Sequence, residues 1–172
     1  MTHQQCTATM TIVSCGFHKS HDALSRRFPD AFHHKRGWGK ELTAFLEGIE
    51  FINLLNSIKG TSTTFTDLYA TLYGMRARGL GRLLLYDIAT QICRDNGISE
   101  ERIYLLGNGP RKAATLLRVP IETVRIKGCT LVYTTIPHGL HAFDLIGHDV
   151  PISLRNSKNG DDFESYLCKW SI

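Results

Sequence analysis

The sequence predicts a mainly α-helical fold with one small β element. Residues 40–58 and 82–96 repeat apolar side chains every three or four positions, the spacing of a helix with one buried face. Only residues 129–136 (CTLVYTTI) are rich in β-branched and aromatic side chains, as strands are. The chain has 172 residues, 42% of them hydrophobic, and this length suits one domain over residues 1–172 with a single core.

The first third of the chain is expected to be helical after its start. Residues 1–14 have no clear period and predict a loose N-terminus or a short strand. A short helix is expected over 18–30, with Pro29 ending it. Residues 32–39 are glycine-containing and predict a loop, and residues 40–58 follow as one long helix.

Two glycine turns divide the middle of the chain. Thr66 is placed to cap a helix that leads to the first turn, Gly79-Leu80-Gly81. Gly97 is a good C-terminal cap for the helix that follows this turn. The segment that begins at Ser99 (SEERIYLL) leads to the second turn, around Gly107. Its acidic first residues suit a helix, but ERIYLL is short and fits a strand as easily.

The last third contains the strand and a closing helix. Residues 120–127 fit either a helical turn or a loop. The strand over 129–136 is followed by a loop over 137–151, with room for one short helix. A polar turn region over 153–162 then leads to a short amphipathic helix over 163–170.

Composition excludes several classes of protein. No apolar run approaches the ~20 residues that a membrane span needs, and the first residues lack the pattern of a signal peptide. We therefore expect a cytoplasmic protein without a membrane partner. The five cysteines are scattered and do not match a disulfide scaffold, so Cys93 and Cys168 are expected to be free and buried, as small hydrophobic residues.

The positive charge of the chain is concentrated in its middle. The formal net charge is +4. Residues 73–127 carry ten Lys and Arg against five Asp and Glu, an excess greater than the net charge of the whole chain. Such asymmetry suggests that the middle segment meets an anionic partner.

The two glycine turns have the residues that a phosphate site needs. Glycine accepts the backbone conformations of a tight turn, and its missing side chain lets a phosphate approach. The first N–H groups of a following helix lack an intrahelical acceptor, and the helix dipole adds to their attraction for anions. Basic side chains flank both turns. The candidate nucleic-acid-binding residues are Arg78, Gly79, Gly81, Arg82, Gly107, Gly109, Arg111 and Lys112.

The segment ARGLGRLLLYDIA resembles the helix-hairpin-helix motif, whose core is a helix, a Gly-hydrophobic-Gly turn and a second helix. The resemblance covers about residues 65–96, and a degraded second copy covers 99–117. It implies phosphate-mediated binding of duplex DNA that is largely independent of sequence and strongly dependent on salt. Leu84 and Leu85 stand where the motif has alanine, and polar Asn108 stands where it has an apolar turn residue.

Two further resemblances carry less information about activity. GLGRLLLYDIA and FESYLC are similar to recurring segments of a group of uncharacterised bacterial proteins, which implies one compact domain ending near Cys168. Hairpin-containing base-excision glycosylases place a catalytic aspartate in the segment that corresponds to residues 98–103. This chain has Glu100 and Glu101 there and no aspartate, which weakens a glycosylase interpretation.

Two groups of residues are candidates for metal or proton chemistry. Cys15, His18 and His21 have side chains that bind zinc, although their spacing matches no standard zinc finger. His138 and His141 could chelate a metal or transfer protons, although histidines in a surface loop need have no such role.

The leading hypothesis is non-catalytic binding of duplex DNA through the Gly79 turn. One alternative is an enzyme acting on a nucleic acid or nucleotide, with a cleft near Asp87 or near His138 and His141. In a helix, Asp87 would share its face with Thr90 and other polar residues, which favours an outward position. The other alternative is a regulatory module whose partner is an acidic protein surface. No nucleotide-cradle or dinucleotide motif is present, so no cofactor is expected.

Overall fold

The structure, a computed structural model, describes residues 17–33, 39–59 and 61–170, with side chains from residue 21 onward. The predicted N-terminal segment over 1–14 lies outside these residues. The helices are α1 (Phe17–Arg27), α2 (Pro29–His33), α3 (Gly39–Glu47), α4 (Ile49–Ile58), α5 (Phe65–Met75), α6 (Arg82–Asn96), α7 (Asn108–Leu116), α8 (Ile136–Leu145), α9 (Ile152–Arg155) and α10 (Gly160–Trp170). The strands are β1 (Arg102–Tyr104), β2 (Glu122–Ile126) and β3 (Cys129–Thr135). These elements confirm the predicted mainly α-helical fold with a small β element.

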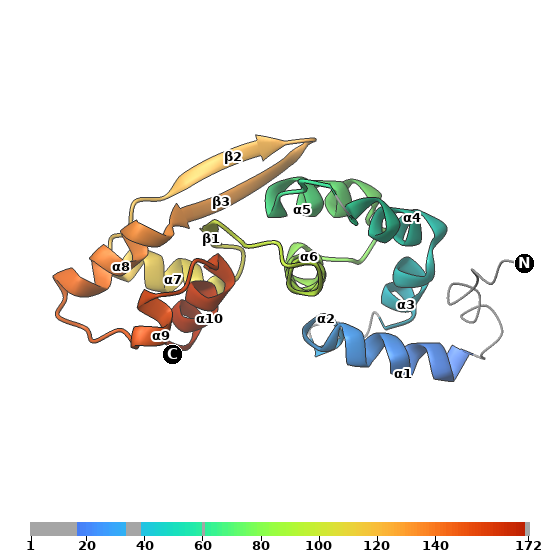
Figure 1. Cartoon of the computed structure of the whole chain (residues 1–172), viewed down its shortest axis with the longest axis horizontal. Helices are drawn as coiled ribbons and strands as arrows, with labels where there is room; N and C mark the ends of the chain where they lie inside the picture. The colour runs from blue at the N-terminus through green and yellow to red at the C-terminus, as the bar shows by residue number, and fades with distance from the viewer. Residues whose placement is uncertain (1–16, 34–38, 60, 171–172) are drawn as a thin grey trace, which may run out of the picture.

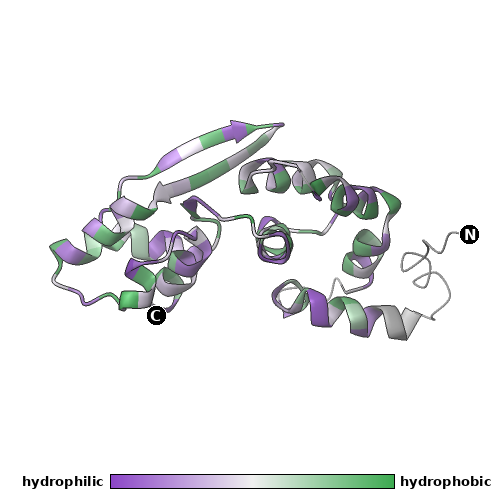
Figure 2. Cartoon of the chain, viewed as in Figure 1, coloured by the Kyte–Doolittle hydropathy of each residue, from purple (hydrophilic) through white to green (hydrophobic). Residues whose placement is uncertain are grey.

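The three strands form a sheet that lies between two hydrophobic cores. β3 is the central strand and pairs antiparallel with both β1 and β2. Side chains alternate between the two faces of a strand. Tyr104 and Leu131 therefore belong to the first core. On the other face, Ile103 belongs to the second core and Val132 packs against it. Apolar and polar residues also alternate along β2 (Figure 2).

Helix α6 lies at the centre of the molecule. In Figure 1 it is seen end-on, with α5 above it, α3 and α4 on its right and α7–α10 on its left. Ile88 and Ile92 of α6 belong to the first core, together with Phe65 and Leu72 of α5. The second core lies beneath the sheet among α7, α8 and α10. Within the described residues, no helix is both long and apolar enough to span a bilayer.

Two predicted helices are each interrupted. The helix expected over 40–58 is wrong as a single element, because Gly48 is extended (φ −62°, ψ 141°) and separates α3 from α4. The N–H of Gly48 donates to the Phe45 carbonyl at 3.2 Å, which closes α3. The helix expected over 18–30 is also split, because Pro29 begins α2, where its fixed φ suits a first helical position.

The segment that begins at Ser99, which fits either a helix or a strand by sequence, forms strand β1 over residues 102–104. Ile103 and Tyr104 are both buried, and each faces a different core. A strand between two cores can bury consecutive residues in this way, and pairing with β3 outweighs the local helical signal. The segment over 120–127, expected to be a helical turn or a loop, is largely β2.

Candidate nucleic-acid interface

The first glycine turn joins α5 to α6 and is fixed by its central leucine. Gly79 has a φ of 94°, a conformation that a β-carbon would oppose. Leu80 is 3% exposed and belongs to the first core, so it anchors the turn to the body of the protein. The Leu80 N–H also donates to the Ala77 carbonyl at 3.2 Å. The Gly-Leu-Gly segment therefore forms a tight, anchored turn between two packed helices.

A buried tyrosine holds the start of α6 against α5. The Tyr69 hydroxyl donates to the Arg82 carbonyl over 3.1 Å. Burial raises the pKa of Tyr69 to about 12, so this hydroxyl keeps its proton at neutral pH. At its other end α6 is closed by Gly97 in the left-handed conformation (φ 66°), as the sequence predicted. The first turn of α6 is thus fixed in position by α5.

The N-terminus of α6 faces solvent. Its N-cap, Gly81, is exposed, and no side chain caps the helix there. No neighbouring heavy atom lies within 4 Å of the place that a Cβ on Gly81 would take. The first N–H groups of the helix have no intrahelical acceptor, and 15 residues of aligned peptide dipoles lie behind them. This arrangement favours an anion.

The three arginines around the turn have different environments. Arg76 folds back, with its guanidinium 3.5 Å from the Tyr73 ring centroid and a hydrogen bond to the Tyr73 carbonyl. Arg82 donates to the Thr130 carbonyl of β3. Arg78 is exposed and makes no hydrogen bond or ion pair with any part of the chain that the structure describes. Arg78 is therefore available to a ligand without breaking an internal contact.

Sequence reasoning missed the part that the β2–β3 hairpin plays at this surface. The Lys127 ammonium, at the tip of the hairpin, donates to the Thr71 hydroxyl of α5 at 3.2 Å. The turn carries Arg76, Arg78 and Arg82, and the hairpin adds Arg125 and Lys127, with its one carboxylate, Glu122, at the end of β2 away from the tip. The only local sequence signal for this hairpin was the pair Lys127-Gly128, which lies between apolar residues and suits a two-residue turn. The hairpin extends the basic surface beyond the turn itself.

The second glycine turn is not a helix-hairpin-helix, because it joins strand β1 to helix α7. Gly107 is the N-cap of α7, and Glu164 of α10 places its Oε1 3.8 Å from the position of a Cβ on Gly107. The protein's own carboxyl group thus lies where a phosphate would approach. Arg111 uses its Nε to donate to the Leu105 carbonyl at 2.6 Å. Lys112 is exposed.

An acidic group of residues lies between α6 and α10. Glu100 is 1% exposed and accepts hydrogen bonds from the hydroxyls of Thr90 (2.8 Å) and Tyr86 (3.2 Å). Buried Asp161 pairs with Arg94. Burial, reinforced by the nearby Asp161 charge, raises the pKa of Glu100 to about 8. These groups hold the two helices together through buried polar contacts, and sequence reasoning missed them.

Asp87 belongs to this acidic region. It is half-buried, and its charge acts on Glu164, whose pKa burial, Asp161 and Asp87 together raise to about 7. Its helical neighbour Thr90 is buried against Glu100, so this polar face of α6 packs on other elements. Asp87 itself is neither fully buried nor fully exposed, so the outward orientation expected from helical spacing stays a prediction.

The structure describes only part of the histidine and cysteine candidates. His138 and His141 lie on α8, where His141 is exposed and the buried Nδ1 of His138 has no hydrogen-bond partner among the described residues. Cys15 and the side chain of His18 lie outside the described residues, while His21 packs edge-on against a phenylalanine. Among the residues that the structure describes, no three His, Cys, Asp or Glu side chains could hold a metal ion.

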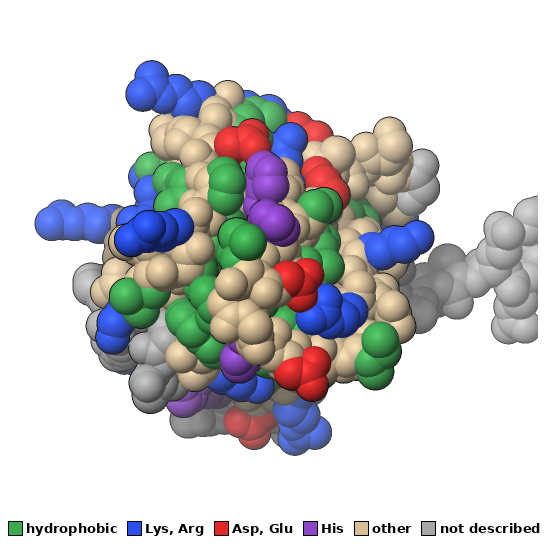
Figure 3. Space-filling view, turned by 90° about the vertical axis from the view of Figure 1, so that its left-hand side faces the viewer, with side chains coloured by type: hydrophobic (Ala, Val, Ile, Leu, Met, Phe, Trp, Pro, Cys, Tyr) green, Lys and Arg blue, Asp and Glu red, His purple; other side chains and the backbone are tan. Residues whose placement is uncertain are grey.

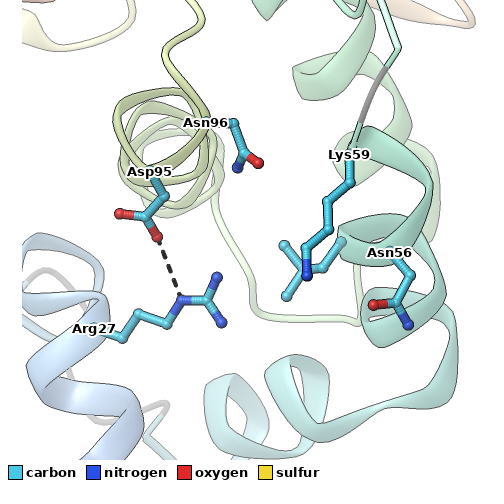
Figure 4. Close-up of a pocket in the computed structure, with 6 residues that line it drawn as sticks. Arg27, Asn56, Lys59, Asp95 and Asn96 are labelled. Carbon is cyan, nitrogen blue, oxygen red and sulfur yellow. Dashed lines mark hydrogen bonds and ion pairs between the residues drawn. The ribbon is translucent and has the colours of Figure 1, made fainter. Parts of the chain in front are cut away.

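A pocket between α1, α4 and α6 is small and crossed by an ion pair. It is lined by Arg27, Asn56, Lys59, Asp95 and neighbouring residues, and Arg27 reaches Asp95 at 3.4 Å (Figure 4). Its volume of about 240 Å³ is below the roughly 300–1,000 Å³ typical of ligand pockets. This pocket does not favour a small-molecule site.

At the end of the molecule formed by the C-terminal helices, positively and negatively charged side chains are mixed. Figure 3 faces this end and shows basic, acidic, histidine and hydrophobic side chains intermixed. The first glycine turn differs, because residues 76–82 carry three arginines and no carboxylate. No family model, curated protein or solved structure matches the chain.

Proposed function

We propose that the protein binds duplex DNA without catalysis, through the turn between α5 and α6. The observation that carries this proposal is the exposed, uncapped N-terminus of α6, which buried Leu80 holds in place. Arg76, Arg78 and Arg82 surround it, and residues 68–86 contain no Asp or Glu. A rigid set of N–H donors beside free positive charge suits a backbone phosphate.

The interaction would depend on charge and geometry and not on base sequence. A phosphate would accept from the first N–H groups of α6, while Arg78 adds a charge-assisted contact from the turn. Contacts of this kind position a protein on a duplex without reading bases. Each neutralised phosphate contributes about 0.9 to the slope of log affinity against log salt.

Replacing Arg78 by alanine should weaken duplex binding without harming the fold, because Arg78 has no internal partner among the described residues. We expect affinity to fall roughly threefold to tenfold at about 0.1 M salt, and the salt slope to fall by about 0.9. Fluorescence anisotropy with a labelled duplex, repeated over a salt series, measures both quantities.

Lys112→Ala is the matched control, because it removes one exposed charge beside the second glycine turn. Its affinity and salt slope should stay within error of the unmodified protein. Thermal melting of both variants checks that the fold is retained. The proposal fails if the unmodified protein does not bind duplex DNA at low salt, or if the two variants lose affinity equally.

A further inference from the structure

We propose that the tip of the β2–β3 hairpin is a second contact to duplex DNA, with Lys127 binding a backbone phosphate beside the one held at the α5–α6 turn. This inference rests on the proposed function, and it adds a segment distant in sequence to the interface. Lys127 is exposed, as are Arg78 and Gly81 of the turn. The two elements would then engage one continuous stretch of duplex backbone.

Two contacts fix the hairpin against the helices that form the turn. Lys127 donates to Thr71 of α5 at 3.2 Å, and Arg82 at the start of α6 donates to the carbonyl of Thr130. At the base of the tip, burial raises the pKa of the Cys129 thiol, while the nearby charges of Arg82 and Arg76 oppose that rise. The hairpin tip and the arginines of the turn therefore share one surface.

Basic residues lie at the turn and at the tip of the hairpin. Residues 76–82 contribute three arginines and no carboxylate, and Lys127 stands at the tip, while the one carboxylate of the hairpin, Glu122, lies at the opposite end of β2. Alternation along β2 places Val124 and Ile126 against the first core, which leaves Arg125 on the other side of the strand. Lys127, at the turn itself, is the hairpin charge that reaches the side of α5.

The backbone at the tip would suit another residue better than lysine. Lys127 (φ 47°) and Gly128 (φ 74°) both have positive φ, as in the two-residue turns that favour Asn-Gly. Only Arg118 (φ 53°) shares this conformation among the described non-glycine residues. An asparagine at position 127 would fit the turn and remove the charge, so binding can be separated from folding.

The test compares Lys127→Asn with Arg118→Asn. Both variants place asparagine at a positive φ and remove one positive charge. Arg118 follows α7 and lies between Leu117 and Val119, which belong to the second core, away from the hairpin tip. Anisotropy titrations of a labelled duplex over a salt series, with thermal melting of each variant, give affinity, salt slope and stability together.

We expect Lys127→Asn to lower duplex affinity about threefold to tenfold at about 0.1 M salt and to reduce the salt slope by about 0.9. Arg118→Asn should leave both unchanged, and Lys127→Arg should keep the slope because it keeps the charge. Equal slopes for the two asparagine variants would overturn the inference. If the two asparagine variants had equal slopes but Arg78→Ala still weakened binding, the proposed function would stand without the hairpin contact. If the unmodified protein did not bind duplex DNA, the proposed function and the hairpin contact would both be overturned.

Discussion

The two glycine turns have similar sequences and opposite surroundings. At the first, buried Leu80 anchors the turn, and the N-terminus of α6 is left open to solvent. At the second, exposed Asn108 takes the corresponding place, and Glu164 from α10 lies beside the N-cap of α7. A glycine turn before a helix thus becomes a candidate anion site only where no other element of the protein fills the space in front of it.

The difference originates in the packing of α10. Gly160 at the start of α10 approaches β1 so closely that its N–H donates to the Glu100 carbonyl at 2.6 Å. This contact brings Asp161 and Glu164 towards α6 and α7. Glu164 lies beside the second turn, whereas residues 76–82 at the first turn carry three arginines and no carboxylate.

Gly160→Ala should have the largest effect on stability among these substitutions. It disrupts the packing of α10 against β1, and this packing places Glu164 beside the second turn. A Cβ on Gly160 would overlap the backbone carbonyl oxygen of Arg102, so α10 or β1 must move. We expect a loss of about 4 kcal/mol or more in the free energy of unfolding, measured by urea denaturation.

Gly74→Ala is the control for that substitution. No heavy atom lies within 4 Å of a Cβ at Gly74 in α5, so alanine should stabilise this helix by roughly 0.5–1 kcal/mol. A Gly160→Ala protein as stable as the unmodified one would show that α10 does not pack as described.

Because of Glu100, the free energy of unfolding should fall as the pH rises. The folded-state pKa of Glu100, about 8, lies above the ordinary value of 4.5, so folding favours the protonated carboxyl. This contribution is complete below about pH 4.5 and is lost as the pH approaches about 8, and Glu164 acts in the same direction. From about pH 5 to about pH 8 we expect Glu100 alone to account for a loss of roughly 3 kcal/mol in the free energy of unfolding.

Glu100→Gln should flatten this dependence, because the neutral amide can bond to Tyr86 and Thr90 at every pH. Glu101→Gln, one residue away and exposed, is the control and should leave the dependence unchanged. Urea denaturation at a series of pH values provides the measurement. A Glu100→Gln profile as steep as that of the unmodified protein would place the pH dependence elsewhere.

Leu80→Ala and Asn108→Ala should differ, because only the first removes a buried anchor. We expect Leu80→Ala to cost about 2–3 kcal/mol of stability, since it empties a buried leucine site. Asn108 is exposed, and its replacement should change stability by less than about 0.5 kcal/mol. Similar losses in thermal melts of the two variants would contradict the difference between the turns.

The sequence predicted features that local chemistry determines. The apolar stripe of α6, the left-handed Gly97 and the strand near Cys129 are all present. Leu80 sits in the core, as an apolar residue between turn glycines suggests. These features depend on residues only a few positions apart, so their pattern is visible without the fold.

Features that depend on distant residues could not be predicted from the sequence. Glu164 lies 57 positions beyond Gly107, and Lys127 lies 56 positions beyond Thr71, yet each pair is adjacent in space. The sequence left the segment of β1 open between a helix and a strand, because its burial on two sides depends on a second core formed by later helices. The openness of the first turn and the closure of the second are tertiary properties.

Gly81→Asp tests most directly whether the open end of α6 binds duplex phosphates. A side chain fits at Gly81 without a clash, and aspartate is a favourable N-cap, so the variant should be at least as stable as the unmodified protein. Its carboxylate would occupy the anion position and repel a phosphate. Gly81→Asn has nearly the same shape without the charge and serves as the control.

In anisotropy titrations at about 0.1 M salt, we expect Gly81→Asp to bind a labelled duplex at least about tenfold more weakly than Gly81→Asn. Both variants should melt at or above the temperature of the unmodified protein. A Gly81→Asp protein that is folded and binds the duplex as tightly as the unmodified chain would contradict the proposal that this turn is the DNA-binding surface.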